Sequence, residues 1–125
     1  MRIITKTGSS NLITYGLTYK EIECRCLYQD CNHTIITSSI LDSYRRVRVG
    51  FNQPLTINSG FRCQRHNFDV GGSPTSRHLY LALDISHDEF EEDSKSELLS
   101  LLRRHFDFVK VYGTFFHCHN DIELG

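Results

Sequence analysis

The sequence of 125 residues lacks both an excess of charge and a long apolar run. Its formal net charge is −1, and its densest basic segment is only Arg45-Arg46-Val47-Arg48, so charge gives no indication of a nucleic-acid or membrane-surface partner. No segment approaches the roughly 18 apolar residues that a membrane-spanning helix needs. The N-terminal residues also lack the apolar core of a secretion signal. We therefore expect no membrane span and synthesis in the cytoplasm.

Internal repeats and low-complexity tracts are also absent, and the composition is that of an ordinary globular domain. Hydrophobic residues make up 39% of the chain and charged residues 23%, which is typical of folded proteins. A chain of this length forms one domain with its own core. We predict an N-terminal arm over residues 1–18, a main domain over residues 19–125, and a monomer.

Five cysteines are many for a chain of this length, and their odd number leaves at least one unpaired in a monomer. Without a secretion signal we expect reduced thiols rather than a disulfide framework. Cys24, Cys26 and Cys31, with Cys63 or His33 as a fourth member, form a candidate structural zinc cluster, although their spacing is not that of a standard zinc ribbon. The alternative is buried thiols, with a Cys24–Cys63 contact, or a disulfide if the protein works outside the cell.

Apolar periodicity predicts a mixture of helices and strands. Residues 35–49 repeat apolar positions at helical spacing and are followed by Gly50, while residues 94–105 repeat leucines in the same way. Residues 79–85 are apolar at nearly every position, which is typical of a buried strand. The remaining predictions are an irregular arm or short strand over 1–16, loops over 19–33 and 60–77, and strands over 54–59, 109–113 and 114–118. This order predicts an α+β fold in which a small antiparallel sheet is flanked by the two helices.

Histidine and aspartate side chains on two of these strands could form an open catalytic zinc site at the sheet face. His78 and Asp84 are six positions apart, so they would share one face of a regular strand. His117 and His119 share a face of the last strand, so either could be the third ligand while the other orients it or acts as a general base. The alternative is a surface His78 beside a solvated Asp84, with His117 as a half-buried core residue. Cys118 lies on the opposite strand face, where we expect a core residue.

An ordered set of short motifs lies between residues 19 and 120. It comprises Ile57-Asn58-Ser59-Gly60-Phe61-Arg62, His66-Asn67, Val70-Gly71-Gly72, Ser76-Arg77-His78, Ala82-Leu83-Asp84-Ile85 and Val111-Tyr112-Gly113-Thr114-Phe115-Phe116-His117. In this order the motifs resemble the D-alanyl-D-alanine carboxypeptidase family of zinc metallopeptidases. The similarity is greatest to the small single-domain branch of bacteriophages and bacterial prophages, whose members cut the peptide stems of peptidoglycan.

The resemblance implies a role for each matching residue. His78, Asp84 and His117 would be the ligands of one catalytic zinc ion. Arg62 would bind or polarise the carbonyl or carboxylate of the substrate. Ser76 would support the loop that presents His78, and the resemblance places Arg62, Ser76 and Asn67 on the substrate side of the site.

Three positions depart from the family pattern. Leu81 stands where the family has a glycine three residues after the first ligand, and His119 stands where an aspartate usually follows the last ligand. Thr114 occupies the position of the acidic general base in the better studied branches, and threonine cannot take a proton near neutral pH. We therefore assign the base to His119, with Asp121 as the alternative.

The sequence thus predicts a phage- or prophage-encoded zinc hydrolase that cleaves amide bonds in peptidoglycan stem peptides, as a carboxypeptidase or an endopeptidase. It would be made in the cytoplasm of a bacterial host and act at the cell wall after release or export. One alternative is a weakly active or inactive module of the same fold that binds cell-wall peptide or a protein partner. A second is a structural virion component, which would be oligomeric and without activity.

Overall fold

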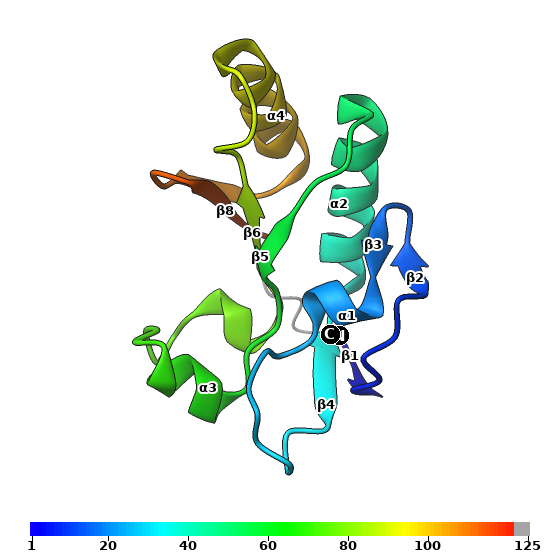
Figure 1. Ribbon diagram of the computed structural model, residues 1–125, viewed down its shortest axis with the longest axis vertical. Helices are drawn as coiled ribbons and strands as arrows, with labels where there is room; N and C mark the ends of the chain where they lie inside the picture. The colour runs from blue at the N-terminus through cyan, green and yellow to red at the C-terminus, as the bar shows by residue number, and fades with distance from the viewer. Residues whose placement is uncertain (122–125) are drawn as a thin grey trace.

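The computed structural model describes residues 1–121, and the elements along this part of the chain form an α+β fold (Figure 1). Their order is β1 (Arg2–Thr5), β2 (Leu12–Thr14), β3 (Leu17–Thr18), α1 (Tyr19–Ile22), β4 (His33–Ile36), α2 (Ser38–Phe51), β5 (Ile57–Ser59), α3 (Gln64–Asp69), the 3₁₀ helix η1 (Arg77–Leu79), β6 (Leu83–Ser86), α4 (Glu92–His105), β7 (Phe108–Val111) and β8 (Phe115–His119). The predicted fold class is confirmed.

A four-stranded antiparallel sheet in the order β5-β6-β8-β7 forms the centre of the fold. Figure 1 shows α2 and α4 side by side at one end of the molecule, with α3 toward the other end. Along β8, Phe116 and Cys118 are buried and join the same core cluster as Leu98 and Leu102 of α4. The alternate residues of β8 are only partly buried, so one face of the sheet packs in the core and the other is free to carry polar groups.

Both predicted helices are present, with shifted ends. In α2, Ile40, Tyr44 and Val47 are fully or almost fully buried, as the apolar spacing predicts. Residues 35 and 36, predicted as the start of this helix, belong to the strand β4. The helix ends at Phe51 and is capped by Asn52, whose φ of 55° is left-handed and whose N–H donates to the carbonyl of Arg48 (3.0 Å), so Gly50 is not the terminating residue.

Three predicted segments are wrong in detail. The predicted loop over 19–33 contains α1, which begins with a capping box between Thr18 and Glu21, and the predicted loop over 60–77 contains α3. The predicted strand over 79–85 begins in a turn, because the N–H groups of residues 79 and 80 donate back to the carbonyls of residues 76 and 77. Only residues 83–86 are extended. The apolar run covers the end of this turn, the buried residues 81 and 82 and a buried strand, and sequence periodicity cannot separate them.

The N-terminal residues are attached to the rest of the fold. Strand β1 pairs antiparallel with β4, and β2 pairs with β3. Glu23 is 3% exposed and its carboxylate accepts hydrogen bonds from the backbone N–H groups of Thr7 (2.6 Å) and Gly8 (2.7 Å). Of the two expectations for this segment, the strand is correct, whereas the division at residue 18 stays a prediction. No helix within residues 1–121 is long and apolar enough to cross a membrane.

Candidate metal centre and substrate cavity

Strands β6 and β8 and the turn η1 bring His78, Asp84 and His117 together. Asp84 lies directly opposite His117 in the antiparallel register, and η1 presents His78 from the side. His78 Nε2 lies 3.2 Å and His117 Nδ1 2.9 Å from the same Asp84 oxygen, Oδ1. One donor atom from each residue falls within 4.8 Å of the others. The arrangement differs from the predicted one in origin, since His78 is on a 3₁₀ turn and the shared strand face of His78 and Asp84 is wrong.

The hydrogen bonds of His78 test whether these residues fit a metal ion. Its Nδ1 lies 2.7 Å from the carbonyl oxygen of Gly60, and a carbonyl only accepts, so Nδ1 carries a proton. In the neutral ring Nε2 then presents a lone pair to the Asp84 carboxylate. Two lone pairs repel unless a proton or a cation lies between them. Two imidazole nitrogens and one carboxylate that converge in this way are the donor set of an open zinc site, so the residues fit the ion.

The electrostatics of Asp84 also suit a metal ligand. Burial raises the pKa of Asp84, but its contacts with the imidazoles of His117 and His78 outweigh burial and bring the pKa down to about 2. Arg62 adds positive charge, with its Nη2 3.7 Å from Asp84 Oδ2. Asp84 is therefore an anion at neutral pH, although it is only 6% exposed.

His119 contacts His117 on the side away from Asp84. The two rings meet through His117 Nε2 and His119 Nδ1 at 2.9 Å, and Phe108 of β7 stacks on His119 with ring centroids 4.6 Å apart. Burial, together with the charges of His117 and Arg77, lowers the pKa of His119 to about 4. His119 is therefore neutral near pH 7 and can accept the N–H of His117. That hydrogen bond would fix the His117 ring with Nδ1 toward Asp84.

Arg62 is held beside this cluster by three neighbours. Its Nε donates to Ser59 Oγ (3.3 Å), its Nη1 donates to Asn67 Oδ1 (3.3 Å), and its Nη2 approaches Asp84. Asn67 is 3% exposed and also donates to the carbonyl of Ser73 (2.8 Å). The contacts of Asn67 in the structure are thus with protein groups, and its predicted contact with substrate stays a prediction.

The segment between Ser76 and Asp84 shapes the approach of His78. Ser76 Oγ accepts from the N–H of His78 (3.2 Å), which starts the η1 turn. Leu81, at the position where the family has glycine, adopts φ of 150°, a conformation that favours glycine. Its side chain is 3% exposed and belongs to the core. Burial of this side chain offsets the backbone strain, so leucine is accommodated here.

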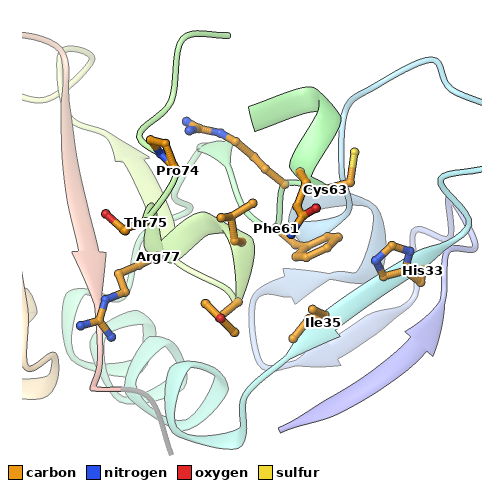
Figure 2. A pocket seen from close by; sticks show the side chains of 11 residues that line it. His33, Ile35, Phe61, Cys63, Pro74, Thr75 and Arg77 are labelled. Atoms are coloured by element: carbon orange, nitrogen blue, oxygen red, sulfur yellow. The ribbon is translucent and has the colours of Figure 1, made fainter. Parts of the chain in front are cut away.

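A cavity of about 350 Å³ opens over the cluster and is lined by His78, Asp84, His117 and His119 together with Arg62, Arg77 and Ser76. A neighbouring cavity has a volume of about 660 Å³. Figure 2 shows Thr75 and Arg77 on one side of it and His33 and Ile35 on the other. Arg62 and Arg77 line both cavities. The two cavities thus share Arg62 and Arg77 in their linings, and guanidinium groups favour a ligand with carboxylate or carbonyl oxygens.

The position of a general base is the weak point of the site. Thr114 is exposed in the turn before β8, and Asp121 is also exposed, its N–H donating to Asp107 (2.8 Å). Asp84 is the sole carboxylate among the described residues that line the smaller cavity. In that lining, His119 is the one described imidazole outside the proposed ligand set, and its Nδ1 faces His117.

Sequence reasoning missed three groups that support the site. The carbonyl of Gly60 orients His78, the ring of Phe108 covers His119, and Arg77 lines both cavities. Every residue has a backbone carbonyl, so the residue type at position 60 does not reveal that its carbonyl orients His78. Phe108 meets His119 only through the β7–β8 register. Arg77 alone had a signal, because it lies within the Ser76-Arg77-His78 motif.

The predicted cysteine cluster is brought together with Cys63 as its fourth member. The four sulfur atoms all lie within 4.8 Å of one another, and they belong to Cys24, Cys26, Cys31 and Cys63. His33 is not a member of this group and instead packs edge-on against Phe61, with ring centroids 5.3 Å apart. Cys118 is fully buried in the core, as predicted.

Comparison with known proteins gives one finding that matches this geometry. A search of curated proteins found no significant match. The family model described as Peptidase M15 matches residues 15–122, which is most of the chain and includes every residue of the His78–Asp84–His117 cluster. This is a family of zinc metallopeptidases of the D-alanyl-D-alanine carboxypeptidase type, as the sequence motifs predicted. The chain belongs to the peptidase M15 family.

Proposed function

We propose that this chain is a zinc peptidase that hydrolyses amide bonds in the stem peptides of peptidoglycan, with His78, Asp84 and His117 holding the ion. The observation that carries the proposal is the approach of His78 Nε2 and His117 Nδ1 to one oxygen of Asp84, in a chain of the M15 family. When bound, zinc would polarise the scissile carbonyl and lower the pKa of water at the site.

The protein groups around the ion would bind and orient the peptide. Arg62 is 18% exposed at its side chain and lines both cavities, so its guanidinium can meet a substrate carboxylate or the developing oxyanion. Asn67 and Ser59 fix the direction of that guanidinium. Ser76 holds the turn that presents His78, and its place in the cavity lining allows a direct contact with the peptide.

For His119, the contacts support an orienting role more than the predicted base role. Its Nδ1 meets His117 rather than the cavity, and Phe108 covers its ring. A metal-ligating imidazole is commonly oriented by a hydrogen bond to its second nitrogen. Loss of that hydrogen-bond partner typically lowers metal affinity or activity by about 10- to 100-fold.

A second candidate function is a module that binds cell-wall peptide without cutting it. The observation that favours it is the cavity lining, where Asp84 is the sole carboxylate among the described residues and is itself a proposed ligand. The exposed Thr114 offers no replacement as a base.

Digestion of purified peptidoglycan, followed by mass analysis of the soluble fragments, tests the proposed function. We expect the zinc-loaded chain to cut the stem peptides, with release of free D-alanine indicating a carboxypeptidase and cleavage at an internal amide bond indicating an endopeptidase. Asp84→Asn should abolish release, whereas Asp93→Asn, at an exposed position of α4, should not. If the chain binds stem peptide but does not cut it, the binding module is the correct function and the proposed peptidase is not. Full activity of Asp84→Asn would show that Asp84 is not a ligand of the catalytic ion.

A further inference from the structure

We propose that Cys24, Cys26, Cys31 and Cys63 bind a second zinc ion, whose role is structural. This site shares no residue with the His78–Asp84–His117 cluster, and the proposal does not depend on peptidase activity. Three of the sulfurs come from the chain between α1 and β4, and the fourth from Cys63, the N-cap residue of α3.

The distances between sulfurs match a tetrahedral thiolate site. Cys24 Sγ lies 3.7 Å from Cys63 Sγ, and Cys63 Sγ lies 4.0 Å from Cys26 Sγ. Four sulfurs at about 2.3 Å from a central zinc ion are separated by about 3.8 Å from one another. A disulfide would need about 2.05 Å between the sulfurs, and all four cysteines are free in the structure. A bound cation would explain why four thiols converge although no two of them are bonded to each other.

Backbone N–H groups already point at these sulfurs. The N–H of Cys63 donates to Cys24 Sγ (3.4 Å), and the N–H of His66 donates to Cys63 Sγ (3.4 Å). The backbone of Tyr28 also hydrogen-bonds the sulfur of Cys26. A thiol is a weak acceptor, whereas a thiolate is a strong one, so these donors favour the anionic sulfurs that a zinc ion requires.

Zinc at this position would also explain how an irregular segment is kept in place. Residues 23–32 contain no helix or strand, and Leu27 within them is 99% exposed. Cys24 and Cys31 are nevertheless buried. A metal ion would join this loop to Cys63, which is 39 residues away from Cys24, and such a crosslink restricts the unfolded chain. Since Cys63 follows Arg62 directly, the crosslink would also steady the backbone beside the substrate cavity.

Counting zinc in the purified full chain under reducing conditions tests this proposal separately from the peptidase site. We expect two zinc ions per wild-type chain. The double variant His78→Ala/His117→Ala should keep one, and Cys26→Ser/Cys31→Ser should also keep one. Cys118→Ala, which removes a thiol outside the cluster, should keep both. The peptidase site failing to bind zinc would leave the double histidine variant at one ion, so the two proposals fail independently.

Cobalt substitution supplies a readout that does not depend on the folding of the cysteine variants. With Co(II) in place of zinc, the double histidine variant should show intense thiolate-to-cobalt charge-transfer absorption in the near ultraviolet. Absence of that absorption from both the wild type and the double histidine variant would overturn the proposal. A Cys24–Cys63 disulfide that persists in the metal-supplied protein under reducing conditions would overturn it as well.

Discussion

The contacts of Arg62 require a guanidinium group. Its guanidinium contacts Ser59, Asn67 and Asp84 at once and still lines both cavities. A lysine ammonium is a single point of charge and cannot replace a planar group that has five donors.

Arg62→Lys should therefore keep the fold and the zinc content while it lowers turnover, or peptide affinity, by about tenfold to a hundredfold, the equivalent of one charged hydrogen bond. Steady-state cleavage of a stem peptide, or a titration with that peptide, measures the change. Arg103→Lys, at an exposed position of α4, is the matched control and should behave like the wild type. If both variants behave alike, Arg62 has no role toward the substrate.

His119→Gln separates the two roles considered for this histidine. If His119 orients His117, zinc affinity should fall by about 10- to 100-fold, and saturating zinc should restore much of the cleavage rate. If His119 is the general base, the variant should bind zinc nearly normally and cleave far more slowly even at saturating zinc. A competition titration with a zinc indicator, with His105→Gln as the control, gives the affinities. We expect the first result, and a normal affinity with lost cleavage would refute the orienting role.

At the level of elements, the site depends on the close approach of the β5–α3 connection to α1. A Cβ on Gly60 would lie 2.6 Å from Ile22 Cα, and the N–H of Phe61 donates to the carbonyl of Ile22 (2.7 Å). Because the obstacle is backbone, no side-chain rotation can relieve it. The same Gly60 supplies the carbonyl that orients His78.

Gly60→Ala should lower the free energy of unfolding by about 1–3 kcal/mol, the usual cost of overpacking. It should also weaken zinc binding at the histidine site, since the carbonyl that holds His78 must shift. Urea unfolding measures the first effect. Gly113→Ala is the control, because a Cβ there has nothing within 4 Å, and its effect should stay within about 0.5 kcal/mol. If the two variants have the same free energy of unfolding, the β5–α3 connection can shift away from α1 without loss of stability.

The helices α2 and α4 and the turn η1 show which local structures a sequence can and cannot predict. The apolar spacing in α2 and α4 predicted both helices, because burial of one helix face leaves a periodic trace. The turn at residues 77–79 left no such trace, since three residues are too few to show a periodic apolar pattern. His78 thus lies beside Asp84, but on a 3₁₀ turn rather than on the predicted strand, and the carbonyl of Gly60 could not be foreseen.

Across the whole molecule, the order of motifs was more informative than any single spacing. Asp84 and His117 are 33 residues apart, and they meet only because β6 and β8 are neighbours in the sheet. No local pattern encodes that pairing, whereas the ordered resemblance over residues 19–120 carries it, and the family match over residues 15–122 agrees. The approach of Cys63 to the three earlier cysteines is likewise a product of the tertiary fold.

The central claim is that His78, Asp84 and His117 hold the zinc ion of a peptidase. An anomalous difference map at the zinc absorption edge, from crystals of the full chain grown with zinc, tests it most directly. We predict a peak among His78 Nε2, an oxygen of Asp84 and His117 Nδ1, at about 2.0–2.2 Å from each donor. A map with no peak at these three residues, from crystals in which zinc is bound elsewhere on the chain, would contradict the claim.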